Sequence, residues 1–229
     1  MVDPQGFTVA FLLIVAGVMM VMALLYAFVR AVSYSTLQGL EEEWRQKYRR
    51  RESGREGEEA VAHELAFLPR GYRVLHRVYL TVPGRSVGQE LDHLVIGPCG
   101  IVHIETKNDL GKIVITPEGD WLIRRDGRKY QGMRNPLAQI RRHGVVLREF
   151  LEREMPGTAV EVTGVVVLSR PETMLQGAAN CPVPILKLER LPDFVTGLPV
   201  ERPLPSRQVE ELYGLFRERA IPVEEDMNL

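Results

Sequence analysis

Two carboxylates and a lysine in one short segment have the residue types of a metal-assisted reaction site. Asp92, Glu105 and Lys107 lie within sixteen residues of one another. Carboxylate oxygens are hard ligands that suit a divalent cation, and a neighbouring lysine can hold water or stabilise charge on a phosphate. Cross-strand pairs of opposite charge are also ordinary surface features, so the residue types alone leave both readings open.

The segment from Gln89 to Lys107 predicts a β-hairpin that brings these groups together. Two apolar runs flank the sequence Gly-Pro-Cys-Gly at 97–100, which is a strong turn signal. Pairing the residues next to this turn makes paired numbers sum to 197, so Asp92 lies opposite Glu105, and Lys107 shares the face of Glu105. We therefore expect the three groups to lie within roughly 5–8 Å of one another.

A helix is predicted before the hairpin. Ser53 and Glu56 have the spacing of a capping box, and Pro69 follows the last apolar residue, Leu68. Glu58 falls on the otherwise apolar side of this helix, where a carboxylate requires a partner, a proton or a metal. We expect Glu58 to approach the same metal as the hairpin carboxylates, through water.

A second helix is predicted from Asn135-Pro136 to about Glu154, with Asn as its N-cap. Gln139 and His143 are four residues apart on one face near its start, a position that suits contacts with phosphate or water. The hairpin histidines His93 and His103 are interpreted as hydrogen-bonded core or rim residues rather than as metal ligands.

The order of elements predicts an α/β fold, a mixed sheet flanked by helices. Strands are expected at 72–82, 89–96, 101–107, 112–116, 121–125 and 160–168, the last as a buried central strand. After residue 169 the chain is rich in proline, with an edge strand expected at 184–188 and a closing amphipathic helix at 206–219. A protein partner is conceivable for this C-terminal part.

The N-terminal region contains an uncharged run of 23 residues at 7–29. As a helix it would span about 34 Å, enough for a bilayer core of about 30 Å, so it predicts a transmembrane helix. The run is long for a signal peptide and has no basic residues before it. Basic residues follow it, which predicts a single-pass cell-membrane protein with its N-terminus outside and its C-terminal domain cytoplasmic.

These features divide the chain into a transmembrane anchor at 1–32, a charged juxtamembrane linker at 33–52, a core domain at 53–169 and a C-terminal extension at 170–229. Trp44 and Tyr48 lie four apart on one face of the linker. A solvated helix is one interpretation of the linker; attraction of its basic half to lipid headgroups or nucleic acid is the other.

The composition of the chain limits the classes of protein and of binding site that it can form. The chain has 229 residues, 45% hydrophobic and 26% charged, with a net charge of −1, which indicates a globular domain with an appendage. Bulk charge therefore does not indicate a polyanion ligand. The two cysteines, Cys99 and Cys181, lack the spacing of a zinc site or a disulfide framework and are interpreted as free thiols.

The ordered motifs resemble the nuclease-related domain called NERD. The resemblance covers roughly residues 54–152 and rests on the following sequence features: Gly57-Glu58, Gln89-x-x-Asp92-His93, Gly97-Pro98-x-Gly100, Ile104-Glu105-Thr106-Lys107-Asn108, Trp121 and Asn135-Pro136-x-x-Gln139. It implies a restriction-endonuclease-like core of the PD-(D/E)-X-K type. Leu91 stands where that superfamily often has proline.

By this resemblance, Asp92, Glu105 and Glu58 would bind Mg²⁺ or Mn²⁺, Lys107 would assist the attacking water, and Gln139 would support the site. The leading hypothesis is a membrane-anchored, Mg²⁺-dependent nuclease acting on DNA or RNA at the cytoplasmic face. The alternatives are a catalytically inactive nuclease-like module that binds nucleic acid or protein at the membrane, and a membrane assembly protein.

Overall fold

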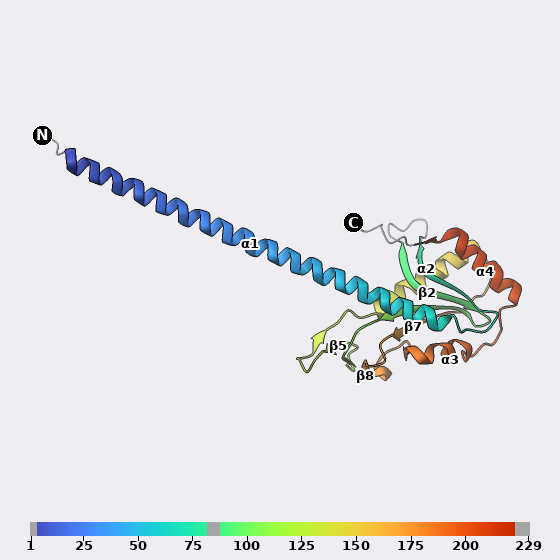
Figure 1. The fold of residues 1–229 in the computed structure, drawn as a ribbon. Coiled ribbons are helices and arrows are strands. Elements are labelled where there is room, and N and C mark those ends of the chain that lie inside the picture. Colours follow the sequence, from blue (N-terminus) through green and yellow to red (C-terminus); the bar gives the residue numbers. More distant parts are fainter. Residues whose placement is uncertain (1–3, 82–87, 223–229) are drawn as a thin grey trace. The chain divides into compact units, whose positions relative to one another are not determined.

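A computed structural model describes residues 4–81 and 88–222 (Figure 1). Many side chains between residues 4 and 41, and those of residues 221 and 222, lie outside this description. The chain forms two compact units, residues 1–52 and residues 53–229.

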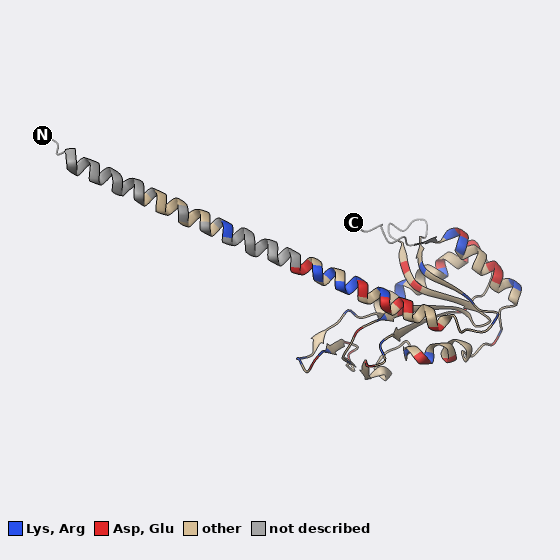
Figure 2. Ribbon diagram, in the orientation of Figure 1, with Lys and Arg blue, Asp and Glu red and all other residues tan. Residues whose placement is uncertain are grey.

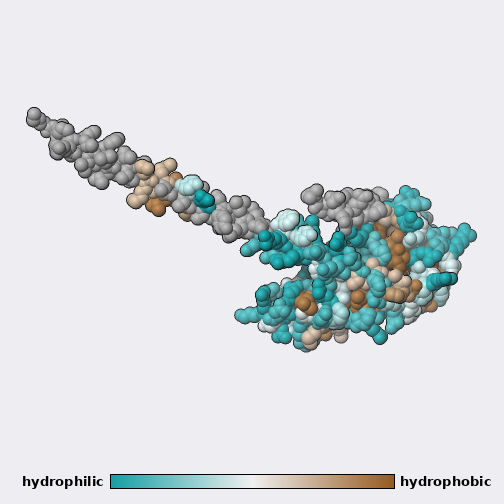
Figure 3. All heavy atoms as spheres, in the orientation of Figure 1, coloured by the Kyte–Doolittle hydropathy of each residue, from teal (hydrophilic) through white to brown (hydrophobic). Residues whose placement is uncertain are grey.

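Helix α1 extends over Pro4–Leu65, and the described residues of the first unit all lie in it. Its described side chains from Met19 to Phe28 are hydrophobic and exposed (Figure 3). The predicted membrane span at 7–29 is not supported, because no helix within the described residues is both long and apolar enough to cross a membrane. The side chains of residues 7–16, which belong to that prediction, lie outside the described residues.

The predicted helix start at Ser53 is wrong, because α1 passes through this residue without interruption. Charged residues with good helix propensity precede it, so the backbone N–H groups at Ser53 already have helical partners and need no cap. The Ser53 side chain instead contacts Asn108, which follows the hairpin. The helix ends at Leu65, and turns lead from there to Gly71.

The second unit contains a six-stranded mixed sheet in the order β10-β1-β2-β3-β7-β9. Its strands are as follows: β1 Arg73–Leu80, β2 Gln89–Gly97, β3 Gly100–Lys107, β7 Val162–Leu168, β9 Ile185–Lys187 and β10 Ile221–Pro222. Strands β1, β2 and β3 form the expected antiparallel meander, and β7 pairs with β3 in parallel. Ile96 pairs with Ile101, which confirms the predicted register.

Helices cover both faces of this sheet, which confirms the expected mixed α/β fold. Helix α2, Leu137–Glu154, and helix α4, Ser206–Arg219, pack on one face through Leu147, Phe150 and Phe216. The C-terminal turns of α1 and helix α3, Leu191–Thr196, pack on the other face. The prediction of a closing amphipathic helix at 206–219 is confirmed.

A second, four-stranded sheet in the order β6-β5-β4-β8 was not anticipated as a separate layer. Its strands are as follows: β4 Lys112–Ile115, β5 Trp121–Arg124, β6 Gln131–Gly132 and β8 Met174–Gln176. Ile113, Trp121 and Ile123 are buried in a cluster that includes Ile140 of α2 and Leu168 of β7. The second sheet is therefore packed against strand β7 of the first sheet and against helix α2, which covers it.

Strand β9 lies at one edge of the large sheet, as expected for the segment after Pro184. Its parallel pairing with β7 leaves β7 in the interior, where Val165 to Leu168 are almost completely buried. The prediction of a central strand at 160–168 is thus confirmed. Two short 3₁₀ helices, Ala178–Asn180 and Leu188–Arg190, complete the connections.

Candidate active site

The large sheet opens between β2 and β3 where the carboxylates lie. Pairing between the two strands extends from Gly97 and Gly100 to His93 and Ile104, and it stops one residue before Asp92 would pair with Glu105. Beyond this point β2 continues to pair with β1, and β3 continues to pair with β7. The backbone pairing of β2 with β3 therefore ends at the residues predicted to do chemistry, and this interruption of the ladder is called the gap between β2 and β3.

Glu105 and Lys107 form the centre of the site. The Glu105 side chain is only 3% exposed, and its Oε1 lies 2.5 Å from the Lys107 ammonium. The same ammonium donates to Gln139 Oε1 at 3.4 Å. Residues two apart on a strand share a face, and β3 presents this face to α2, so the structure brings all three predicted residues together.

The start of α2 depends on its predicted cap. Asn135 Oδ1 accepts the backbone N–H of Leu137 at 2.9 Å, and Pro136 O accepts the N–H groups of Gln139 and Ile140. Proline at this position needs no hydrogen-bond partner for its nitrogen. The helix thus begins where Gln139 can reach Lys107, and the prediction of this helix start is confirmed.

The Asp92 side chain makes a hydrogen bond to β3 at the point where the backbone pairing of β2 with β3 has ended. Its Oδ2 accepts the backbone N–H of Thr106 at 2.7 Å, a donor that the strand ladder leaves without a β2 partner. Burial raises the pKa of the Asp92 carboxyl well above its usual range, and the nearby charges of Glu105 and Glu58 raise it further. The hydrogen bond from Thr106 thus keeps the Asp92 carboxyl near Glu105, although the charge of Glu105 disfavours ionisation of Asp92.

The second carboxylate oxygen of Glu105 has no hydrogen-bond partner among the described residues. This buried atom, Oε2, lies 4.0 Å from Nδ1 of His143, which is likewise buried and unpaired. Burial lowers the pKa of His143 to about 4, with smaller effects of Arg142 and Lys107, so the imidazole is neutral at pH 7. An orphaned carboxylate oxygen in the interior is unusual and indicates a place for a ligand.

The hairpin histidines differ from each other. His93 Nδ1 is hydrogen-bonded to Nδ1 of His76 at 2.8 Å, which confirms its interpretation as a hydrogen-bonded core residue. His103 is buried, but its Nδ1 has no partner among the described residues, so the expectation of a hydrogen bond is not met there. Burial lowers the pKa of both His93 and His103 to about 3. Neither is charged near neutral pH.

Glu58 approaches this region from the opposite face of the sheet, because α1 and α2 cover different faces. Its Oε2 lies 3.8 Å from Nε of Arg77. Burial raises the pKa of Glu58 although Arg77 lowers it, and the charge of Glu105 adds to the increase. Glu59 points outward with 69% of its side chain exposed, as expected.

Arg77 is a residue that sequence reasoning missed. In the β1–β2 register it would pair with Asp92, but the ladder omits this pair, and Arg77 has a φ of 49°. A bulky residue in the left-handed region is strained by about 1–3 kcal/mol, and such strain is frequent at functional sites. Only the β1–β2 register identifies this position, because nothing in the local sequence distinguishes it.

A polar cluster fixes α1 against the end of β3. Asn108 Nδ2 donates to the Ser53 backbone oxygen at 2.5 Å, and Ser169 Oγ donates to Asn108 Oδ1 at 2.7 Å. Gly57 permits this close approach, since a Cβ there would lie 2.7 Å from Asn108 Cβ and 2.9 Å from Ser169 Oγ. The cluster positions Glu58, which is adjacent to Gly57, and the strand that carries Lys107.

The carboxylate oxygens at the gap suit a hard divalent cation, although they do not form a complete set of ligands around one position. No three His, Cys, Asp or Glu side chains in the described part of the chain form a ligand cluster, so Asp92, Glu105 and Glu58 do not make one together. Mg²⁺ commonly uses one or two protein carboxylates and completes its octahedron with water and phosphate oxygens. Asp92 and the unpaired Glu105 Oε2 satisfy that requirement.

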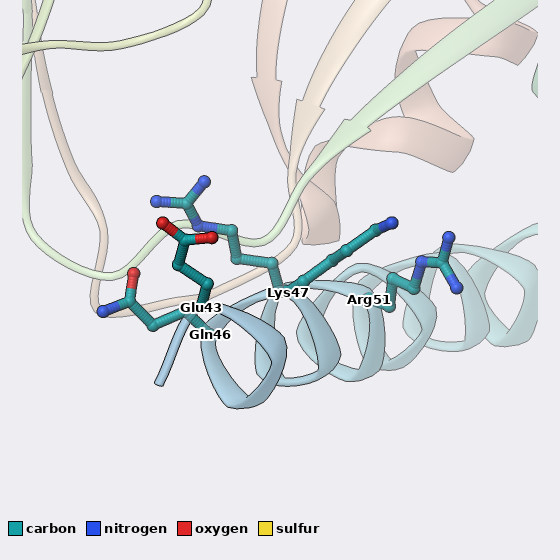
Figure 4. A pocket seen from close by; sticks show the side chains of 5 residues that line it. Glu43, Gln46, Lys47 and Arg51 are labelled. Carbon is teal, nitrogen blue, oxygen red and sulfur yellow. The ribbon is translucent and has the colours of Figure 1, made fainter. Parts of the chain in front are cut away.

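A separate basic surface lies on α1 in the first unit. A hollow there is lined by five side chains at helical spacing along one face (Figure 4): Glu43, Gln46, Lys47, Arg50 and Arg51. Trp44 and Tyr48 stack with 5.8 Å between ring centroids, which confirms that they share a face. Both interpretations of this helix, a solvated helix and a basic surface for lipid headgroups or nucleic acid, stay predictions.

Comparisons with known proteins identify a family for the second unit. Residues 53–169, slightly more than half of the chain, match NERD, the nuclease-related domain. An uncharacterized protein of Bacillus anthracis is 31% identical over 104 residues, which cover 45% of this chain and 49% of that protein. The chain thus spans about half the length of this curated relative.

One solved structure also resembles the chain. The crystal structure of protein VC1899 from Vibrio cholerae is similar over 61% of this chain and 30% of that one, with 16% identity and a TM-score of 0.28. This likeness is too weak to bear on the fold or the site. The match over residues 53–169 shows instead that the chain belongs to the NERD, or nuclease-related domain, family.

Proposed function

We propose that the protein is a Mg²⁺-dependent nuclease that hydrolyses phosphodiester bonds of DNA or RNA, built on a restriction-endonuclease-like core. The observation that carries this proposal is the unpaired, buried Oε2 of Glu105 beside Asp92 at the gap between β2 and β3. Membership of the nuclease-related family supports the reaction class. Two carboxylates held together in spite of their repulsion suit a site that gains a cation.

Each residue has a distinct role in this proposal. Asp92 and Glu105 hold Mg²⁺ or Mn²⁺, and Glu58 supports them from the other face. The bound ion supplies Lewis-acid stabilisation of charge on the phosphoryl oxygen. Lys107 holds the attacking water and offers its ammonium to developing negative charge, and Gln139 orients that ammonium through its 3.4 Å hydrogen bond.

His143 limits where the Glu105 carboxylate can lie. The Nδ1 atom of its neutral ring lies 4.0 Å from Oε2, so the ring borders, without bonding to it, the oxygen that Lys107 does not hold. A neutral imidazole does not compete with a cation for the carboxylate charge. Lys107 is therefore the charged hydrogen-bond donor of this site, and the carboxylate oxygens that it does not contact are available to a cation.

The test is cleavage by the purified full chain of single-stranded, duplex and structured nucleic acids with Mg²⁺, Mn²⁺ or EDTA. We expect cleavage only with a divalent cation, and loss of cleavage in Asp92→Ala and Lys107→Ala. Glu59→Ala is the matched control, because Glu59 is exposed and next to Glu58. Thermal melting of each variant shows whether it is folded. Cleavage that survives both substitutions would contradict the assignment.

The second candidate is a catalytically inactive nuclease-like module that binds nucleic acid or protein. One observation favours it: the Lys107 ammonium neutralises Glu105 without a cation. Thermal melting with Mn²⁺ separates the two functions. A cation that binds the folded state at one hundred times its Kd adds about 2.7 kcal/mol of stability. A rise in Tm that Asp92→Ala abolishes favours the nuclease, whereas no rise favours the inactive module.

Attachment to the cell membrane is a separate proposal that rests on the uncharged run at 7–29 and the basic residues after it. It places the N-terminus outside and the nuclease domain in the cytoplasm. Fractionation of cells followed by carbonate washing tests this proposal. Recovery of the full chain in the soluble fraction would exclude it. A protein partner for residues 170–229 is likewise proposed from sequence alone.

A further inference from the structure

The hairpin formed by β5 and β6 carries a concentration of positive charge that the proposed reaction does not use. Between Arg124 and Arg134 there are five basic residues and one acidic residue, although the whole chain has a net charge of −1. Every residue from Arg124 to Gly132 is exposed, as is Arg134. Lysine and arginine positions, blue in Figure 2, can be followed to the end of this hairpin.

The end of the hairpin is a tight turn with a defined backbone geometry. Asp126 and Gly127 have φ values of 48° and 68°, and the Arg128 N–H donates to Arg125 O at 2.9 Å. Two successive positive φ values with this hydrogen bond define a type I′ turn, whose twist matches that of the flanking strands. The base of the hairpin is fixed as well, because Trp121 and Ile123 are buried.

Partners within the domain hold two of the basic side chains. The Arg124 guanidinium lies 5.1 Å from the centroid of the Tyr130 ring, and Arg125 forms an ion pair with Asp109 at 2.5 Å. Arg128, Lys129 and Arg134 make no ion pair with any described residue. Three cations therefore remain exposed, Arg128 and Lys129 just after the turn and Arg134 just after β6.

The hairpin is connected directly to the catalytic segments. Asp109, the partner of Arg125, is two residues after Lys107, and a Cβ on Gly111 would lie 2.5 Å from Arg124 O. On the other side, Asn135 donates to Gly119 O at 3.3 Å and caps the helix that carries Gln139. A polyanion bound by the hairpin would thus be held by the same backbone that positions Lys107 and Gln139.

We propose that the β5–β6 hairpin is a docking element for duplex DNA, with Arg128, Lys129 and Arg134 on the phosphates that border a groove. Paired strands lie about 4.8 Å apart, and the major groove of B-form DNA, about 12 Å wide, admits a two-stranded ribbon. The major groove of A-form RNA is too deep and narrow for this. The inference rests on the proposed nuclease function and names its substrate class.

Binding in EDTA tests the proposal independently of cleavage. The full chain is titrated against a DNA duplex, an RNA duplex and a DNA single strand of one sequence, at several salt concentrations. The test variant is Arg128→Gln/Lys129→Gln, and the matched control is Arg202→Gln/Arg207→Gln. The control pair is equally exposed and removes the same charge elsewhere in the domain.

We expect the hairpin variant to bind duplex DNA about tenfold or more weakly, with a salt dependence shallower by roughly two phosphate contacts. Its loss on the RNA duplex and the single strand should be smaller, and the control should bind like the wild type. Unchanged DNA binding, or an equal loss in the control, overturns the proposal. An equal loss on all three nucleic acids shows a general polyanion contact and overturns the assignment to duplex DNA.

The outcome is distinguishable from failure of the nuclease assignment. An inactive protein whose hairpin variant still loses duplex binding would keep the docking surface while losing the proposed reaction. Conversely, metal-dependent cleavage together with unchanged duplex binding by the hairpin variant would support the proposed reaction and contradict the docking surface. Tyr130→Ala extends the test, because loss of the ring under Arg124 should weaken duplex binding without changing net charge.

Discussion

Two groups of charges in the nuclease-related domain show how burial decides what a charge can do. At the gap between β2 and β3, Glu105 is almost inaccessible and Lys107 is partly buried, with side chains 3% and 16% exposed. At the end of the β5–β6 hairpin, the cations are exposed. Electrostatic interactions are strong and specific in the first environment and weak, additive and screened by salt in the second.

This difference teaches that the two regions should respond to mutation on different scales. A buried carboxylate with an unpaired oxygen is held in an unfavourable state by the fold, and it becomes favourable only with a ligand. An exposed arginine needs no such support. Changes at the gap should therefore have large effects on chemistry and stability, whereas changes at the hairpin should mainly affect association.

The largest effect is expected for Glu105→Gln. The amide keeps the shape of the side chain but removes its charge, so the cation and Lys107 both lose their partner. We expect the cleavage rate to fall on the order of 10³-fold, because charge stabilisation by a metal contributes several kcal/mol. Single-turnover cleavage with saturating protein measures this rate. A fall of less than tenfold in a folded variant would mean that Glu105 is not part of the reaction.

Packing around the gap gives the next largest effect. Gly57→Ala places a Cβ 2.7 Å from Asn108, so the polar cluster must shift, and we expect a loss of about 1–3 kcal/mol in the free energy of unfolding. Gly54→Ala is the control in the same helix, because nothing lies within 4 Å of its Cβ. Helix propensity should make that change neutral or stabilising. Equal effects in urea denaturation would refute the role of Gly57.

A smaller effect of opposite sign is expected for Asp92→Asn in EDTA. The raised pKa of Asp92 means that the folded state keeps its proton to higher pH than the unfolded state. Wild-type stability therefore falls as pH rises from about 4, the usual unfolded value, to the folded pKa, and the loss persists above it. The asparagine variant avoids this loss and should be more stable at pH 7, on the order of 1 kcal/mol.

Thermal melting between pH 3.5 and 8 measures this difference, and the exposed Asp120→Asn serves as its control. The gain in Asp92→Asn should vanish near pH 3.5, where aspartate is protonated in both states. A gain that is constant over the whole range would show that Asp92 does not titrate as its surroundings require. No gain at pH 7 would show that the carboxylate is not destabilising without metal.

The smallest effect belongs to the exposed ion pair at the hairpin. Arg125→Gln removes the contact with Asp109, and 48% of the Arg125 side chain is exposed. Surface pairs typically contribute about 0–1 kcal/mol, so we expect a change in unfolding free energy within that range. A double-mutant cycle with Asp109→Asn isolates the pair. A coupling above about 2 kcal/mol would mean that the hairpin is held more tightly than its exposure indicates.

Much of the fold was predictable because its signals are local. Gly97 to Gly100 specified the turn and therefore the register of β2 and β3, and Asn135-Pro136 specified the start of α2. The shared face of Glu105 and Lys107 follows from strand geometry alone. The false helix start at Ser53 has the opposite cause: a capping pattern is present, but the preceding residues already form a helix.

The sequence by itself determined which residues are candidates for the chemistry and which of them share a face, because periodicity and turn residues act over a few positions. Only the tertiary structure decided that β2 and β3 part beside Asp92, that Arg77 takes a strained conformation, and that the basic hairpin is tied through Arg125 to Asp109, two residues after Lys107. These features depend on competition among strands and helices distant in sequence, and such competition leaves no local signal.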